Sequence, residues 1–205
     1  MVNERKDIKY QVEKGYRPTS LIHLVNKETI KEQHRKQQKG KASGIDRITK
    51  EEYDKDLDNN IDNLISCMKK FSYKPLPVRR TYIPKLNGKL RPLGIPAYED
   101  KLVQGVMANI LNEIYECKFL DCSYGFRPNR NCHQAIRTIN QHIMINKVNY
   151  ILDADIKGFF DNVNHEWLMK FLEHDIGDKN FLRYIKRFLI SGYMEDMKCY
   201  ETDKG

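Results

Sequence analysis

A predicted β-hairpin is the feature that most constrains the fold of this chain. The segments Val78–Lys85 and Lys89–Ile95 are predicted strands, and Leu86-Asn87-Gly88 lies between them. Asn-Gly between two strands is a strong hairpin signal, because both residues tolerate the positive φ angles of tight turns. The sequence therefore predicts an antiparallel pair within a chain whose other apolar residues recur mostly at helical spacing.

Two registers of this hairpin are open, and they differ in the placement of its cations. A two-residue Asn-Gly turn pairs Leu86 with Lys89 and puts Lys85 and Arg91 on opposite faces. A three-residue loop with Gly88 in the left-handed region pairs Lys85 with Lys89, and then Lys85, Lys89 and Arg91 share one face, opposite Tyr82 and Leu90. The second register makes a cationic fork suited to phosphates. The alternative is an exposed basic hairpin whose charge only keeps the sheet edge from aggregating.

The remaining elements are predicted to be mainly helical. Thr49-Lys-Glu-Glu52 is a capping box, and Asn164 is a predicted N-cap. Together with the hairpin they predict an α+β fold, with helices around small antiparallel sheets. The last segment, residues 191–205, is predicted to form a turn and a short strand. The predicted helices cover residues 20–37, 49–68, 100–115, 131–145, 165–172 and 181–189.

The stretch Tyr150–His165 combines a predicted strand, a Lys-Gly turn and the start of a helix. With period two, Asp153 and Asp155 lie on one face of a strand that ends near Ile156. A carboxylate at a strand end before a glycine turn is well placed to bind Mg²⁺, which prefers hard oxygen ligands. The alternative is that Asp153 is only a polar residue at the edge of a sheet and that Asp161 only caps a turn.

The positive charges indicate a polyanionic partner. The formal net charge is +8, and residues 27–41 hold six Lys or Arg against two Glu. A second basic segment, Ser123–Ala135, places Arg127 and Arg130 beside the aromatic residues Tyr124 and Phe126, which favours nucleic-acid contact. For the first segment, a solvated helix face is the alternative interpretation.

Other classes of protein are disfavoured by the sequence. No apolar stretch approaches the ~20 residues that span a bilayer, and the N-terminus has no apolar signal-peptide region, so no membrane partner is expected. The five cysteines show no Cys-x-x-Cys spacing, which argues against a zinc site or a disulfide framework and favours the reducing cytoplasm.

Three motifs in order carry a family resemblance. They are Tyr82-Ile-Pro-Lys-Leu-Asn-Gly-Lys-Leu-Arg-Pro-Leu-Gly-Ile-Pro96, Ser123-Tyr-Gly-Phe-Arg-Pro128 and Asp153-Ala-Asp-Ile-Lys-Gly-Phe-Phe-Asp161. Together they resemble reverse transcriptases (maturases) encoded by bacterial group II introns. The resemblance implies the fingers and the first part of the palm of a right-hand polymerase. It divides the chain into a basic N-terminal helical extension (1–45), fingers (46–145) and a partial palm (146–205).

The resemblance also implies roles for individual residues, with Mg²⁺ as the cofactor. Asp155 would be the catalytic and metal-binding aspartate, assisted by the Ile156 carbonyl, and Phe160 would exclude a ribose 2′-hydroxyl. The incoming dNTP would meet Lys85, Arg91 and the backbone around Gly158 and Phe159. RNA template, DNA primer and intron RNA would be the nucleic-acid partners. The residues expected to contact nucleic acid are Arg79, Arg80, Lys89, Arg127, Arg130, Lys31, Arg35 and Lys36.

The sequence lacks one expected motif. Family members supply a further aspartate pair from a Tyr-x-Asp-Asp turn, and this sequence contains no Asp-Asp. Tyr193-Met-Glu-Asp196 resembles that turn only superficially, because Glu replaces the first aspartate. We therefore expect an N-terminal fragment of a longer polymerase that is inactive alone and can self-associate through exposed apolar surface. The alternatives are an intron RNA-binding module that assists splicing without catalysis, and an unrelated basic protein whose aspartates are structural.

Overall fold

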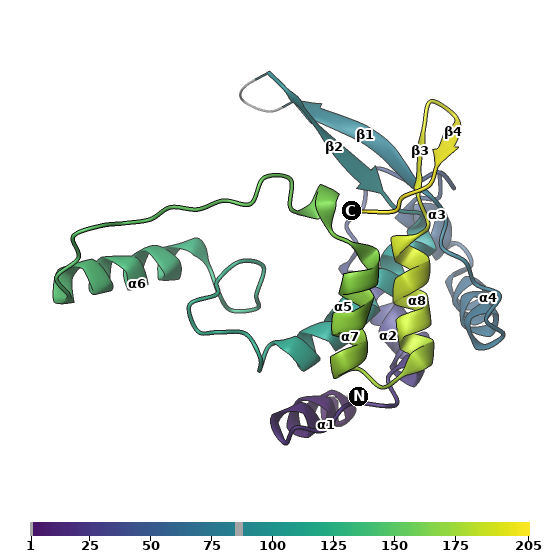
Figure 1. Cartoon of the computed structure of the whole chain (residues 1–205). Helices are drawn as coiled ribbons and strands as arrows, with labels where there is room; N and C mark the ends of the chain where they lie inside the picture. Colours follow the sequence, from purple (N-terminus) through teal and green to yellow (C-terminus); the bar gives the residue numbers. More distant parts are fainter. Residues whose placement is uncertain (1, 85–87) are drawn as a thin grey trace.

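The computed structural model describes residues 2–84 and 88–205 and shows a helical body, a four-stranded sheet on one side of it and a projecting arm (Figure 1). Within the described residues, no helix is long and apolar enough to cross a membrane. The elements in chain order are α1 (Val2–Glu13), η1 (Ile22–Leu24), α2 (Lys27–Lys36), α3 (Lys50–Asp54), α4 (Leu57–Lys69), β1 (Val78–Pro84), β2 (Leu90–Ile95), α5 (Tyr98–Tyr115), α6 (Cys132–Ile145), η2 (Phe160–Asn162), α7 (His165–Asp175), α8 (Lys179–Leu189), β3 (Tyr193–Glu195) and β4 (Lys198–Tyr200).

Helix α5 is the centre of the body. Its apolar residues recur every three or four positions, and α1 and α2 pack against it. Asp100, near its start, is also buried; it accepts hydrogen bonds from the Tyr73 hydroxyl and from the Leu76 N–H, at 2.9 Å for the latter. The helix therefore fixes both the helical core and the chain that enters the sheet. Its buried apolar residues are Tyr98, Leu102, Val103, Val106, Met107, Ile110 and Ile114.

The hairpin forms in the second of the two predicted registers. Ile83 pairs with Arg91 and Pro84 with Leu90, and Gly88 has a φ of +75°. Lys85, Leu86 and Asn87 lie outside the described residues, but the pairing on either side of them is that of the wider loop. The antiparallel hairpin and the predicted face of Arg91 are confirmed.

The sheet is larger than expected and it is mixed. Its order is β2-β1-β3-β4, and β3 runs parallel to β1 with Val78 beside Tyr193. The prediction of antiparallel sheets only was therefore wrong, as was a single short strand after residue 191. A two-residue turn, Asp196-Met197, with φ of +48° and +62°, closes the β3–β4 hairpin. Its residues lack glycine, so the sequence carried no tight-turn signal there.

The predicted strand at Tyr150–Ile156 does not form. This segment has no regular secondary structure and its side chains are exposed. Tyr150, Leu152 and Ile156 have the period-two pattern of a strand, but a strand also needs a neighbour to receive its backbone hydrogen bonds. None of the four described strands lies beside it. The period-two pattern favours a strand, but the strand does not form because no described strand lies beside it to pair with it.

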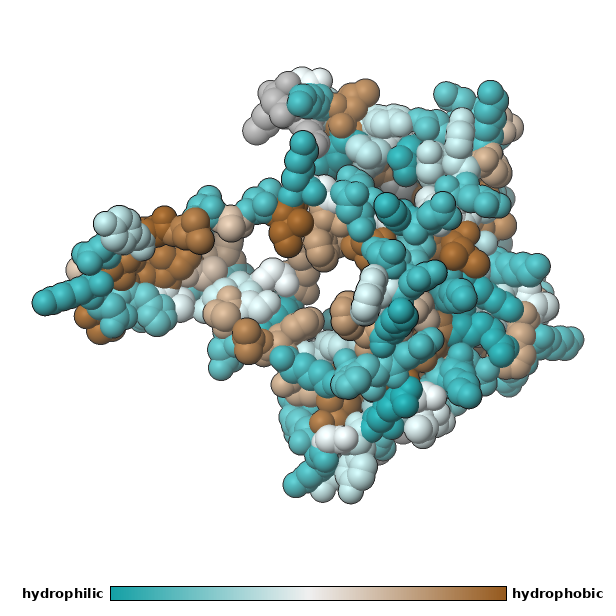
Figure 2. All heavy atoms as spheres, in the orientation of Figure 1, coloured by the Kyte–Doolittle hydropathy of each residue, from teal (hydrophilic) through white to brown (hydrophobic). Residues whose placement is uncertain are grey.

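Helix α6 and the following segment form the arm that projects from the body (Figure 1). Ile136, Ile139 and Ile143 make an apolar stripe along α6, yet the helix has no buried residue. Figure 2 shows hydrophobic surface along this arm. The Asn131 side chain caps α6 in a capping box with Gln134, so local signals define the helix although none of its residues is buried.

Two helix predictions need corrected boundaries. The helix predicted over residues 20–37 begins only at Lys27, because Asn26 caps it. The helix predicted over residues 49–68 is two helices, α3 and α4, which break around Lys55 and Asp56. The predicted helices at 100–115, 131–145, 165–172 and 181–189 are confirmed, with ends that differ by three residues or fewer.

Candidate nucleotide and nucleic-acid site

The turn after Asp155 is built by Gly158 and Asn162. Gly158 has a φ of +61°, which favours glycine, and the Asn162 side-chain amide donates to its carbonyl at 2.8 Å. Phe159 and Phe160 follow, with their rings 5.3 Å apart and edge to face. Phe160 is 73% exposed. The aromatic rings are thus presented to solvent beside a turn of fixed shape.

The end of the chain supports this turn. The Gly205 N–H donates to the Val163 carbonyl at 3.1 Å, and Asn164 forms an isolated bridge with Lys204. A side chain at position 205 would come within 3.1 Å of the Phe160 carbonyl, so the two segments are in close contact. Helix α7 then begins at His165, capped by Asn164 as predicted.

The predicted metal ligands are not gathered into a metal site. Asp155 and Ile156 are exposed on the segment without secondary structure. In the described part of the chain, no three carboxylate, histidine or cysteine side chains come together. Mg²⁺ commonly binds through one or two carboxylates and substrate phosphates, and two-ion chemistry needs several carboxylates. As arranged here, the described residues do not fit a two-ion centre.

The hairpin presents cations on both faces. Arg79 and Arg91 share one face, because Arg79 pairs with Ile95 and Arg91 with Ile83. The Arg79 guanidinium donates twice to the Ser43 carbonyl, at 3.0 and 2.7 Å, whereas Arg91 is exposed. Lys89 adjoins this pairing, and Lys85 is outside the described residues. This face therefore offers at least one accessible guanidinium near the turn.

Arg80 lies on the opposite face and is held by aromatic stacking. Its guanidinium carbon is 3.8 Å from the centre of the Tyr193 ring, which stacks on Tyr200 at 5.0 Å and 16°. The Arg80 Nε is buried and has no hydrogen-bond partner. The stack joins β1 to β3 and β4, and no local pattern predicts this contact, because Tyr193 is more than a hundred residues away from Arg80.

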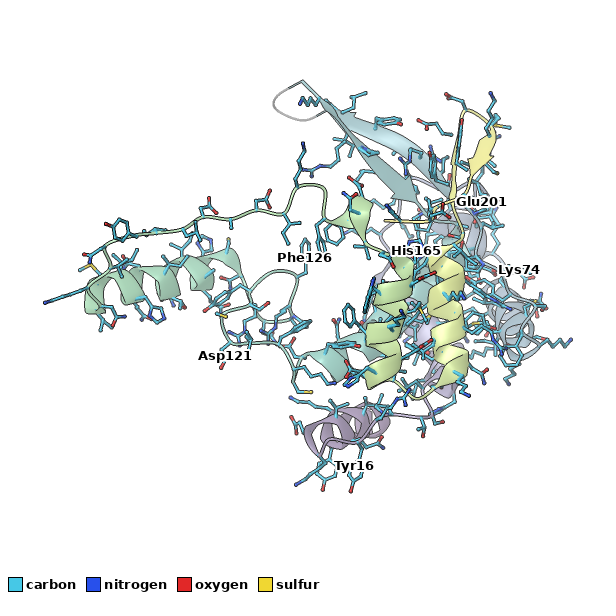
Figure 3. All side chains as sticks on the ribbon, in the orientation of Figure 1. Tyr16, Lys74, Asp121, Phe126, His165 and Glu201 are labelled. Atoms are coloured by element: carbon cyan, nitrogen blue, oxygen red, sulfur yellow. The ribbon has the colours of Figure 1, made fainter. Side chains whose placement is uncertain are left out.

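Arg127 and Arg130 make their hydrogen bonds inside the chain. The buried Arg127 guanidinium donates to the Glu116 carboxylate at 2.8 Å and to the Leu120 carbonyl at 2.7 Å. The hydrogen bond that Arg127 donates to the Glu116 carboxylate lowers the pKa of Glu116. Arg130 contacts Asp121 at 3.1 Å. Phe126, labelled in Figure 3, is fully exposed at the tip of this loop.

The cations of α2 are mostly neutralised by carboxylates. Lys31 contacts Asp58 of α4 at 2.6 Å, and Lys36 contacts Glu32 at 2.7 Å. The hydrogen bond from Lys31 is the main reason that the pKa of Asp58 is lowered. Arg35 is exposed. Asp58 and Asp62 of α4 are thus the partners of the basic helix α2.

The Tyr193-Met-Glu-Asp196 segment belongs to the β3–β4 hairpin. Glu195 accepts a hydrogen bond from the Tyr82 hydroxyl of β1, so its carboxylate lies against the sheet. In the sheet, β3 lies beside β1, so this segment is next to one of the two strands that carry the hairpin cations. The described residues do not bring Asp155 into a cluster with other carboxylates.

Comparison with known proteins places these motifs in a family. The family described as reverse transcriptase (RNA-dependent DNA polymerase) matches residues 83–204. The group II intron-encoded protein LtrA of Lactococcus lactis is 41% identical over 149 residues, covering 72% of this chain and 24% of that protein. Protein YkfC of Escherichia coli is 41% identical over 126 residues, covering 60% of this chain and 33% of YkfC. The chain thus spans a third or less of the length of these relatives.

Proposed function

This chain belongs to the reverse transcriptase (RNA-dependent DNA polymerase) family, and we propose that it contributes the fingers and the first part of the palm to an RNA-directed DNA polymerase. The observation that carries the proposal is the hairpin register. It gives Arg91 an exposed position near the turn, on the same face as Arg79. Guanidinium groups bind phosphate oxygens through pairs of hydrogen bonds, which suits a triphosphate or a template strand.

We assign the roles around the hairpin and the turn as follows. Arg91 and Lys85 hold the phosphates of the incoming dNTP, and the backbone N–H groups of Gly158 and Phe159 assist. The exposed Phe160 ring is the sugar gate. Asp155, with the Ile156 carbonyl, is one of the Mg²⁺ ligands when the remaining carboxylates are present. Arg79, Arg80 and Lys89 lie beside the template and primer.

A further role for the same chain is RNA binding in support of intron splicing. Relatives of this chain are described as intron-encoded proteins, and one is named nuclear intron maturase 1 of Arabidopsis thaliana, 32% identical over 96 residues. For this role the exposed Arg35 is a better candidate than Lys31 and Lys36, which are ion-paired. The two roles are compatible in one protein.

Catalysis by the chain alone is not expected. Two-metal phosphoryl transfer needs one ion for the primer 3′-hydroxyl and another for the leaving pyrophosphate, held by several carboxylates. No such cluster exists among the described residues, and the sequence has no Asp-Asp pair. Primer extension on an RNA template should therefore be absent for the 205-residue chain. Robust synthesis would refute the proposal that further carboxylates are needed beside Asp155.

The assignment of Asp155 is tested in a protein that joins this chain to a palm segment carrying an aspartate pair. Asp155→Ala should abolish primer extension there while RNA affinity is retained. Asp153→Ala is the matched control, because Asp153 is exposed on the same segment and has no proposed ligand role. Equal activity of the two variants would remove Asp155 from the site.

The sugar gate is tested in the same protein by Phe160→Ala. Incorporation of ribonucleotides should rise relative to deoxyribonucleotides, because a smaller side chain leaves room for the 2′-hydroxyl. Phe159→Ala is the control, since its proposed contribution is a backbone N–H that the substitution retains. Unchanged selectivity in Phe160→Ala would refute the gate.

A further inference from the structure

A second basic surface lies at the junction of α7 and α8. A groove of about 420 Å³ is lined by the cations Arg17, Lys179, Arg183 and Lys186, with Glu173 as its one carboxylate. All four cations are exposed. The α7–α8 connection lies at the end of these helices away from the sheet (Figure 1). We call this surface the α8 groove.

Helix geometry aligns three of these cations. Lys179, Arg183 and Lys186 are separated by four and three residues, so they lie on one face of α8. At 1.5 Å per residue they span about 10 Å along the helix axis. The buried Phe181 and Tyr184 anchor another face of α8 in the core, and the buried Leu182 lines the groove itself. The cations are therefore held in a row on a packed helix.

Arg17 is fixed beside this row by the N-terminal segment. Its guanidinium donates to the carbonyls of Glu173 and Ile176, the latter at 2.9 Å, at the end of α7. The Gly177 N–H donates to the Pro18 carbonyl at 2.7 Å. A side chain at position 177 would approach the Thr19 methyl to 2.8 Å, so glycine permits this close contact. Arg17 is therefore pre-organised at the rim of the groove.

The remaining cations differ in how they are held. The Arg183 guanidinium lies 4.5 Å from the centre of the Phe71 ring, which restrains it without neutralising its charge. In the described part of the chain, no carboxylate lies within ion-pair distance of Lys179 or Lys186. The lysines of α2, in contrast, face Asp58 and Asp62 of α4. Carboxylates therefore neutralise the lysines of α2 more than they neutralise Lys179 and Lys186 of the α8 groove.

We propose that the α8 groove binds the phosphate backbone of RNA, outside the hairpin site. The inference rests on the proposed function, which makes RNA the polyanion that the protein meets. A row of cations with only one carboxylate is complementary to successive phosphates and has no base-reading group, so its contribution is independent of sequence. The groove extends the RNA contact from the fingers to the far end of α7 and α8.

The test uses the 205-residue chain and a fluorescently labelled single-stranded oligouridine. Lys179→Gln/Lys186→Gln removes two exposed cations that have no ion-pair partner, so the fold should be retained. The dissociation constant at about 0.15 M salt should rise roughly tenfold. Between about 50 and 200 mM salt, the slope of log K against log salt should become shallower by about 0.7 for each lysine. Lys55→Gln/Lys70→Gln is the control, with the same loss of charge from exposed lysines near α4.

Each outcome decides the inference. Equal salt slopes for the groove variant and the control overturn it. If Lys89→Gln, which changes an exposed cation assigned to the template and primer, still weakens binding in that case, the proposed function stands and only the groove is rejected. Failure of the unchanged chain to bind RNA rejects both. Loss of binding to phosphatidylserine vesicles or to a polyglutamate peptide, with RNA binding unaffected, assigns the groove to another partner and also overturns the inference.

Discussion

Helices α5 and α6 have the same kind of sequence and opposite surroundings. Both have apolar residues at helical spacing, and both form as the sequence predicts. Ile110 of α5 is 1% exposed, whereas Ile139 of α6 is 57% exposed. An amphipathic pattern therefore predicts a helix and its apolar face, but it does not identify what covers that face. No residue of α6 is buried, and its Thr138 hydroxyl lies 2.7 Å from the Tyr124 hydroxyl of the preceding loop, whereas eight residues of α5 are buried.

The largest expected difference is in hydrogen exchange. Amides in the middle of α5 should exchange only through global unfolding, which for domains of this size costs about 5–15 kcal/mol. Amides of α6 should exchange through local fraying, because a 14-residue helix without packing is marginal in water. Mass spectrometry of exchanged peptides measures both. Comparable protection of the two helices would show that α6 is covered in solution.

Matched truncations should give the next largest effect. Ile110→Ala leaves a cavity in the core and should lower the free energy of unfolding by about 3 kcal/mol. Ile139→Ala should change it by less than about 0.5 kcal/mol, because its side chain is already exposed. Urea unfolding followed by tryptophan fluorescence measures the difference at the single Trp167. A large cost for Ile139→Ala would break the contrast between the two helices.

The caps of α8 and α6 extend the comparison. One Asp178 oxygen accepts from the N–H groups of Asn180 and Phe181, and the other from Leu21 and Ile22, at 2.6–3.0 Å. Asp178→Asn replaces one acceptor oxygen with an amide donor, so it should cost about 2 kcal/mol of global stability. Equilibrium unfolding at neutral pH measures this cost, and a neutral result would contradict it.

The cost of Asp178→Asn should depend on pH. Burial raises the pKa of Asp178, but the four backbone N–H donors together outweigh it, and the pKa lies below its ordinary value. A carboxyl with a lowered pKa stabilises the fold fully above its unfolded pKa of about 4 and loses that effect as pH falls through the folded pKa. The stability difference between wild type and Asp178→Asn should therefore shrink in acid, and a constant difference would contradict the charge effect.

The smallest effect is expected at the cap of α6. Asn131→Ala removes the hydrogen bond to the Gln134 N–H, which is 3.0 Å long, and should destabilise α6 locally by about 1 kcal/mol. Global unfolding should be unchanged, because no residue of α6 is buried. Circular dichroism should show a small loss of helical signal before the main unfolding transition. A shift of that main transition would place α6 within the cooperative unit.

Local signals made much of the fold predictable, and distant contacts made the rest unpredictable. Asn164 marked the start of α7, and Asn87-Gly88 marked the hairpin without deciding between its two registers. The sequence could not show that Tyr150–Ile156 lacks a neighbouring strand, because pairing depends on residues far along the chain. It could not show that Lys31 meets Asp58, since charge composition gives no pairing.

The candidate site, too, was predictable where local patterns decide and unpredictable where distant contacts decide. Alternation and turn chemistry predicted the hairpin and left two registers for Arg91, of which the structure has one, and the role of Arg91 in phosphate binding stays a prediction. Arg127 was predicted to contact nucleic acid from its place in a basic, aromatic loop. In the structure its guanidinium is buried against Glu116, and no local pattern distinguishes such an arginine from an exposed one. Its contact with nucleic acid also stays a prediction.

The contact of Asp178 with Leu21 joins residues 157 positions apart, and Arg17 reaches Ile176 across 159 positions. These contacts close a loop that contains most of the chain. A ribosome releases the chain from its N-terminal side, so Arg17 and Leu21 emerge long before Ile176 and Asp178, which bind them. We expect residues 17–22 to stay partly ordered until α8 is synthesised, whereas α2 can already pack against α4 and α5. Loop closure of this length makes the docking of the two ends a late step in folding, exposed to chaperones during translation.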